Sequence, residues 1–259
     1  MRIATWNVNS IKQRLEHLLR FLRDVQPDVI CLQELKCVDE AFPREDIEAL
    51  GYNVETHGQK AYNGVAILSK RPIEDCRRHL PGEPDEQARY LEGVVSTPGG
   101  AVRIASIYLP NGNPIGTPKF DYKLAWMDRL KAHARDLLKN EEPVVLAGDL
   151  NIIPEPRDAR FPQNWVRDAL FQPESRAKFR EILNSGYGEA LRLCDDGPGP
   201  YTFWDYQAGS WQKNDGIRID HLLLSPQAMD RLTGVKVHKE TRGWEKPSDH
   251  VPVVAHLDL

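Results

Sequence analysis

The chain has 259 residues, of which 41 % are hydrophobic and 28 % are charged, an ordinary balance for a folded globular protein. The length fits one large domain or two small ones and is sufficient for a sizeable hydrophobic core. The net charge of −4 argues against a protein that coats nucleic acid non-specifically, because such proteins usually carry a basic surface.

Features that mark export or membrane insertion are missing from the sequence. No segment approaches the apolar length of a membrane-spanning helix. The start, MRIATWNVNS, lacks the basic flank and long apolar stretch of a secretory signal. The four cysteines show no CxxC spacing, which is typical of reduced thiols in a cytosolic protein. We therefore expect a cytoplasmic protein with no membrane partner, and nothing in the sequence demands more than a monomer.

In the first half of the chain, apolar runs of strand length are separated by turn residues and by two helical stretches. Helices are predicted over residues 11–25, capped by Ser10, and over residues 43–51, between Pro43 and Gly51. Strands are predicted at residues 2–8, 28–33, 52–57, 63–70, 90–97 and 101–110.

The second half repeats this alternation after a helix predicted at about 120–139. Residues 152–186 read as irregular and then helical, 187–194 as a short helix and 195–200 as a rigid Gly- and Pro-rich loop. Strands are predicted at residues 143–151, 201–204, 217–224, 232–238 and 251–259. Helices alternating with strands in both halves predict a four-layer α/β sandwich, with two mixed β-sheets packed face to face and helices outside. No linker divides the chain, so we expect a single domain over residues 1–259.

Acids and amides stand at the ends of several of these apolar runs. Asn7 ends the first, Glu34 ends the second, and Asp149 and Asn151 end VVLAGDLN. Asp149 and Asn151 lie two apart, so in extended chain they point the same way. Singly, each has an ordinary interpretation: Glu34 as a solvated rim residue and GDLN as a turn that Gly148 permits. Together they predict an oxygen-rich metal and phosphate site, because a buried carboxylate must be paired or metal-bound.

An acid and a histidine near the carboxyl end of the chain fit the same site. Asp220 lies inside the apolar run IRIDHLLL, where it needs a buried partner, and His250 is a natural one. Although a lone histidine is more often structural, an aspartate that orients it would leave its second nitrogen free for a phosphate or a proton. If Glu34, Asp149, Asp220 and Asp249 are all site carboxylates, the remaining acids equal the 34 Lys and Arg in number, so net charge does not exclude a nucleic-acid substrate.

This set of side chains suits phosphodiester hydrolysis. A hard cation can polarise phosphoryl oxygens, a carboxylate can activate water, and His, Asn or Tyr donors can stabilise the developing charge. The set contains no thiolate, which favours Mg²⁺, with Mn²⁺ as a substitute, over a structural zinc ion.

Six strings in order, NVN, LQELK, YLPN, GDLN, RIDHLLLS and SDHVPV, resemble the exonuclease III family of apurinic/apyrimidinic endonucleases, within the endonuclease/exonuclease/phosphatase superfamily. The resemblance extends from Asn7 to His250. It implies that Glu34, Asp249 and Asn7 hold the metal, with Asp149 and Asn151 available to a second ion. It also implies that Asp149 activates water, and that Asn151 contacts the phosphate or the transition state.

The resemblance assigns the remaining site residues as well. Tyr108 and Asn111, from YLPN, would contact the scissile phosphate, although a strand-end tyrosine could equally pack on the core. His250, oriented by Asp220, would bind a phosphate oxygen, and Lys36 would lie near Glu34 and the phosphate. Phe203, Ile217 and Ile219 would form the apolar wall for an extruded, base-free sugar, whose flipping costs less than that of an intact nucleotide.

Further aromatic and basic residues are weaker candidates for contacts with DNA. Tryptophans that are either core residues or stacking residues are Trp204, Trp211 and Trp244. Basic residues in or beside loops, which could contact the phosphate backbone, are Arg89, Lys119, Lys213, Arg218 and Arg242.

The resemblance thus implies a Mg²⁺-dependent DNA-repair nuclease. Its partner would be duplex DNA with abasic sites or blocked 3′ ends, cut 5′ to the abasic site, with 3′–5′ exonuclease and 3′-phosphodiesterase activity in addition. Two alternatives remain: a phosphatase or phosphodiesterase of the same fold that acts on inositol phosphates or lipid headgroups, and a non-catalytic nucleic-acid-binding regulator. The regulator would be expected to lack the ligand residues, which are all present here.

Overall fold

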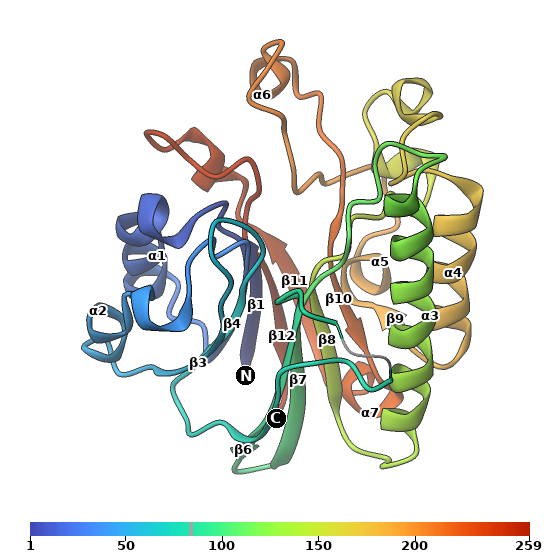
Figure 1. Ribbon diagram of the computed structural model, residues 1–259. Helices are drawn as coiled ribbons and strands as arrows, with labels where there is room; N and C mark the ends of the chain where they lie inside the picture. The colour runs from blue at the N-terminus through green and yellow to red at the C-terminus, as the bar shows by residue number, and fades with distance from the viewer. Residues whose placement is uncertain (83–84) are drawn as a thin grey trace.

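The computed structural model describes residues 1–82 and 85–259. Two six-stranded mixed sheets pack face to face and are covered by helices on their outer faces (Figure 1). The fold class predicted from the sequence is confirmed. No helix in the described part of the chain is long and apolar enough to cross a membrane.

The first sheet has the strand order β11-β12-β1-β2-β4-β3. Its parallel pair is β1 with β2, in which Asn7 lies opposite Gln33, and its other pairs are antiparallel. Its strands are β1 (Arg2–Asn7), β2 (Val29–Gln33), β3 (Asn53–His57), β4 (Val65–Ser69), β11 (Leu232–Val237) and β12 (Val253–Leu257).

The second sheet has the order β5-β6-β7-β8-β10-β9. Its parallel pair is β7 with β8, and β10 runs antiparallel to β8 with Asp220 opposite Asp149. Its strands are β5 (Glu74–Arg77), β6 (Tyr90–Thr97), β7 (Gly100–Tyr108), β8 (Val144–Asp149), β9 (Gly188–Glu189) and β10 (Asp220–Leu224).

Three apolar layers hold the sandwich together. Alternate residues of β8 illustrate this, because Val145 and Ala147 face the other sheet whereas Val144 and Leu146 face the outer helices. In Figure 1, α1 and α2 cover the first sheet, and α3 and α4 cover the second. The helices are α1 (Ile11–Asp24), α2 (Arg44–Glu48), α3 (Pro118–Leu138), α4 (Pro173–Asn184), α5 (Ala190–Cys194), α6 (Ser210–Lys213) and α7 (Pro226–Met229).

Several local predictions were wrong. Ser10 occupies the position before α1, but with φ at 86° its side chain makes no capping hydrogen bond. Residues 201–204 form no strand; Phe203 makes only isolated bridges to Ile217 and His250. In residues 187–194 the helix is shortened to α5 and preceded by β9. The strand β5 was not predicted because its four residues, EDCR, are all exposed and show no apolar alternation.

Candidate active site

The polar residues singled out in the sequence meet where the two sheets adjoin. The parallel pairs β1–β2 and β7–β8 bring their carboxyl ends to one edge, and these ends carry Asn7, Glu34, Tyr108 and Asp149. The antiparallel strands β10 and β12 begin at the same edge, which adds Asp220 and places the segment containing His250 beside them. Each sheet therefore contributes about half of the group.

Glu34 lies at the centre of a hydrogen-bonded set. Its Oε1 accepts from Asn7 Nδ2 and from the Tyr108 hydroxyl, both at 2.9 Å, and its Oε2 lies 3.0 Å from Lys36 Nζ. Burial raises the pKa of Glu34, but the Lys36 ammonium and the Asn7 amide outweigh it and leave the pKa lowered. Burial and the neighbouring Glu34 carboxylate raise the pKa of Tyr108, so its phenol keeps its proton and remains a donor.

The backbone of these loops is held in an unusual conformation. Glu34, Lys36 and Asn151 have φ values of 54°, 55° and 47°, in the left-handed region that side-chain-bearing residues seldom adopt. Such strain persists only where the surroundings fix it, and it clusters at functional sites.

Asn7 and Asp149 join the two sheets. Asn7 Nδ2 donates to Asp149 Oδ2 at 2.9 Å as well as to Glu34, and its Oδ1 accepts from Asn9 N at 3.0 Å. Asn7 therefore holds the two carboxylates at a fixed separation. Its assignment as a metal ligand stays a prediction and would need the second lone pair of Oδ1.

Gly148 explains how Asp149 reaches this position. A Cβ atom at Gly148 would lie 1.9 Å from the carbonyl oxygen of Ile107 on β7, so no other residue fits there without moving the strand. Asp149, which is 2 % exposed, follows directly, and its Oδ1 accepts from the Asn151 backbone at 3.0 Å. Burial raises the pKa of Asp149 to about 7, assisted by Asp220 and opposed by His250.

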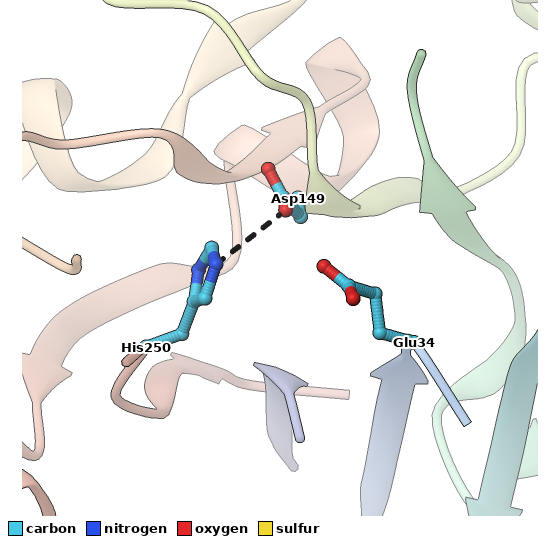
Figure 2. Close-up of side chains that lie close together, drawn as sticks. All are labelled: Glu34, Asp149 and His250. Atoms are coloured by element: carbon cyan, nitrogen blue, oxygen red, sulfur yellow. Dashed lines mark ion pairs between the residues drawn. The ribbon is translucent and has the colours of Figure 1, made fainter. Parts of the chain in front are cut away.

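His250 lies between two carboxylates. Its Nδ1 lies 2.9 Å from Asp220 Oδ2, and its Nε2 lies 3.7 Å from Asp149 Oδ2, the ion pair drawn dashed in Figure 2. Burial disfavours the imidazolium, but Asp220 and Asp149 outweigh it and raise the pKa of His250 to about 10. The ring is therefore a cation at neutral pH, with one N–H directed at Asp220 and the other toward Asp149.

The arrangement suits a hard divalent cation. Single ligand atoms of Glu34, Asp149 and His250 lie within 4.8 Å of one another, and Figure 2 shows their side chains converging. A protonated imidazole has no lone pair to offer, so the carboxylate oxygens are the fitting donors, and oxygen donors are what Mg²⁺ and Mn²⁺ prefer. The donor set therefore fits such an ion, with His250 as a neighbour rather than a ligand.

Asp249 lines the same cavity from the side of the first sheet. Its Oδ1 accepts from Asn9 Nδ2 at 3.0 Å, and Asn9 Oδ1 accepts from Lys36 Nζ at 2.5 Å. Asn9, which was not singled out in the sequence, thus connects Asp249 to the Lys36–Glu34 pair.

A cavity of about 300 Å³ opens beside these groups. All three predicted apolar residues line it, Ile217 and Ile219 as buried residues and Phe203 stacked edge-on to His250 at 5.0 Å between ring centroids. Lining residues that sequence analysis missed are Trp165, Asp168, Leu170 and Asp205. Three of these lie in or near the irregular segment 152–172, where no periodic pattern indicates which side chains point inward.

Asn111 and Asn151 line this cavity side by side. Asn111 Nδ2 donates to Asn151 Oδ1 at 3.3 Å, and Asn151 Nδ2 donates to the Leu109 carbonyl at 2.9 Å. The structure thus brings every predicted site residue to one edge of the sandwich. The chemical role of each remains a prediction.

Two of the basic residues proposed as DNA contacts are buried. Arg218 is 1 % exposed and forms ion pairs with Asp158 and Glu189 at 2.8 Å, so its assignment to the phosphate backbone was wrong. Arg242 is 7 % exposed and donates to the Trp204 carbonyl at 3.1 Å, so it too is poorly placed.

The other weaker candidates divide between surface and core. Lys119 and Lys213 are exposed, and Arg89 stacks on the Tyr108 ring at 4.9 Å. Trp204 is fully buried. Trp244 packs against Trp6, in the apolar layer between the first sheet and its outer helices. Contacts of these residues with DNA stay predictions.

Comparison with known proteins identifies the family. The profile described as Endonuclease/Exonuclease/phosphatase family matches residues 4–250. The chain belongs to this family. Exodeoxyribonuclease III of Haemophilus influenzae is 33 % identical over 266 residues, which cover 99 % of this chain and 100 % of that protein.

Solved structures of family members agree closely with this one over the full length of both chains. A 3′ phosphatase from Neisseria bound to a product DNA hairpin superposes with a TM-score of 0.95 at 37 % identity. An AP endonuclease from Archaeoglobus fulgidus superposes with a TM-score of 0.95 at 34 % identity. The resemblance to exonuclease III enzymes is confirmed, and the chain is an enzyme of the nuclease and phosphodiesterase type.

Proposed function

We propose that this chain is a Mg²⁺-dependent DNA-repair nuclease that hydrolyses the phosphodiester 5′ to an abasic site in duplex DNA and also removes blocking groups from 3′ ends. The observation that carries the proposal is the convergence of Glu34, Asp149 and His250 beside a cavity with one apolar wall. A single catalytic domain over residues 1–259, acting as a monomer in the cytoplasm, is part of the proposal.

Binding of the phosphate follows from the charges of the site. The His250 imidazolium and the Asn111 amide face the cavity and have N–H donors that can bind non-bridging oxygens. The Tyr108 hydroxyl can join them when its single proton turns from Glu34 to the phosphate. A divalent cation held by Glu34 and Asp249, when bound, would supply Lewis-acid stabilisation of charge on the phosphate. Because the His250 ring is fixed by its hydrogen bond to Asp220, it needs little reorganisation as charge develops.

Hydrolysis also requires a group that orients water. Asp149 is buried, held by Asn7 and by the Asn151 backbone, and lines the same cavity as Phe203. In our proposal the Asp149 carboxylate accepts a proton from water as the water oxygen bonds to phosphorus. The bond from phosphorus to the 3′ oxygen breaks, and that oxygen takes a proton from solvent, which leaves a 3′-hydroxyl and a 5′-phosphate.

The cavity supports the choice of substrate. About 300 Å³ with Phe203, Ile217 and Ile219 on one side can hold a sugar that lacks its base. The same space beside the phosphate-binding donors can hold a blocked or terminal 3′ nucleotide. The activities named for the similar enzymes from Archaeoglobus and Neisseria, an AP endonuclease and a 3′ phosphatase, are compatible with these two uses.

The deciding experiment uses a labelled duplex with one synthetic abasic analogue, beside an intact duplex with a recessed 3′ end, each with Mg²⁺ and with EDTA. We expect one Mg²⁺-dependent cut on the 5′ side of the analogue, and shortening of the control duplex measures exonuclease activity. Folded protein that cleaves neither DNA, but hydrolyses a soluble inositol polyphosphate, would contradict the proposal and establish the phosphatase alternative.

A further inference from the structure

A fully buried lysine lies behind the candidate active site. Lys123, on α3, has no exposed surface. Its Nζ donates to the Pro110 carbonyl at 3.0 Å and to the Asn151 carbonyl at 2.7 Å. Both bonds are buried, and both acceptors are neutral backbone groups.

Stability alone is a poor explanation for this lysine. An ammonium removed from water is costly, and a well-packed apolar side chain of similar size is often as stable or more so. The remaining buried residues of α3, such as Trp126, Met127 and Leu130, are mostly apolar. They pack in the apolar layer between the second sheet and its outer helices. Burial also lowers the pKa of Lys123 to about 7, which reflects the cost of placing its amino group here. Its presence therefore needs a reason connected with the groups that it contacts.

Those two carbonyls belong to the two loops that carry site residues. Pro110 immediately precedes Asn111 in the loop after β7, and Asn151 follows Asp149 in the loop after β8. The loops are also joined directly, because Asn151 Nδ2 donates to the Leu109 carbonyl and Asn111 Nδ2 donates to Asn151 Oδ1. Lys123, on α3, also links the two loops, because its Nζ donates to one carbonyl of each.

The chain passes very close over the lysine. A Cβ atom at Gly112, where φ is 88°, would lie 2.6 Å from Lys123 Cδ and 3.1 Å from its Cβ. The loop after β7 therefore rests on the methylene stem of Lys123, while the amino group of the same side chain donates to the Pro110 carbonyl. Lys123 therefore holds this loop in two ways, by packing against Gly112 and by donating a hydrogen bond to the Pro110 carbonyl.

We propose that Lys123 is a positioning residue, whose side-chain amino group holds the loops of Asn111 and Asn151 together so that both amides and Asp149 face one phosphate. This inference rests on the proposed nuclease function. Lys123 does not line the cavity, and the two hydrogen bonds of its Nζ go to backbone carbonyls of the loops, so it acts through Asn111 and Asn151 rather than on the substrate.

The test compares Lys123→Met with Lys131→Met, a control on the same helix whose lysine forms surface ion pairs with Asp128 and Glu181. Steady-state cleavage of the abasic duplex is measured well below the melting temperature of each protein. We expect kcat of Lys123→Met to fall about 100-fold with KM nearly unchanged, since misplacement of catalytic groups by about 1 Å costs this much. Lys131→Met should match the wild type.

A double-mutant cycle with Asn111→Ala separates positioning from a merely structural role. If Lys123 acts through Asn111, the two substitutions share one loss, and the double variant should lose much less than the product of the single effects. Fully additive losses, or a wild-type kcat in folded Lys123→Met, would overturn the inference. If Lys123→Met does not fold, Lys123→Gln, which keeps a donor, replaces it, and failure of both to fold would show a role in stability and overturn the inference as well.

Failure of the proposed function gives a different result. In that case the wild type and Lys131→Met would also leave the abasic duplex intact, whereas failure of the Lys123 inference alone leaves the wild type and Lys131→Met fully active.

Discussion

His250 and Asp220 form a buried pair in which the imidazole Nδ1 lies 2.9 Å from one carboxylate oxygen and 3.1 Å from the other. The pair fixes the ring plane and directs Nε2 toward Asp149 and the cavity. The Asp220→Asn variant keeps the size of the side chain and removes the charge that sustains the imidazolium. We expect roughly a 100-fold loss of kcat, comparable to the loss of one transition-state donor. Cleavage of the abasic duplex at neutral pH measures it, and an unchanged kcat would show that His250 does not act as a cation.

Asp149→Asn should be the most damaging single change. The asparagine side chain has the same shape, and its one carbonyl oxygen can still accept a hydrogen bond from Asn7 or from the Asn151 backbone. The substitution removes the carboxylate that accepts a proton in our proposal. We expect kcat to fall by several orders of magnitude, about 10³-fold or more, because loss of a general base and of a charge combine. Circular dichroism and binding of uncleaved abasic duplex in EDTA should stay close to the wild type. Near-normal turnover would remove Asp149 from the water-activating role.

Stability should depend on pH through His250. Its pKa is raised from 6.5 to about 10 by Asp220 and Asp149 against the opposing effect of burial. A raised pKa in the folded state gives stability that is fully present below pH 6.5 and is lost as pH rises toward 10. In EDTA, the difference in free energy of unfolding between the wild type and His250→Asn should therefore shrink across this interval. Denaturant melts at several pH values test this, and a constant difference would mean that the ring is neutral when folded.

Arg218 should matter for stability and not for DNA. It is paired on two sides in the interior, with Asp158 and Glu189. Arg218→Met leaves these acids with fewer partners and should cost about 3–5 kcal/mol in free energy of unfolding. The exposed Lys213→Met serves as the control and should cost little. If Arg218→Met instead keeps its stability and weakens DNA binding with a reduced salt dependence, the original assignment to the phosphate backbone was right.

The residues that sequence analysis found share a simple signal, a polar side chain at the end of an apolar strand. Asn7, Glu34 and Asp149 were accessible in this way because parallel strands bring their carboxyl ends to one edge of a sheet. The alternation of side chains along an extended chain would have corrected the assignment of Arg218 to the phosphate backbone. Ile217 and Ile219, its two neighbours, face the cavity, so Arg218 faces away from it.

Other parts of the site carried no such signal. Trp165 and Asp168 reach the cavity from an irregular segment whose path depends on tertiary contacts, such as the bond from Asn113 Nδ2 to Asp168 at 3.0 Å. Lys123 is one of several lysines in a helix with a mixed surface, and its burial depends on two loops that are close only in the folded state. Residues 201–204 have strand composition, but Phe203 makes only isolated bridges, to Ile217, which precedes β10, and to His250, which precedes β12.

The strand directions also decide where the ends of the chain emerge. β1 starts at Arg2 and runs toward the site, β12 runs away from it to Leu257, and the Met1 amino group donates to the Leu257 carbonyl. Both termini therefore lie together at the end of the sandwich opposite the cavity (Figure 1). A tag, a surface tether or a second protein joined at either terminus would leave the DNA-facing edge unobstructed, which makes the chain well suited to immobilised or fused formats.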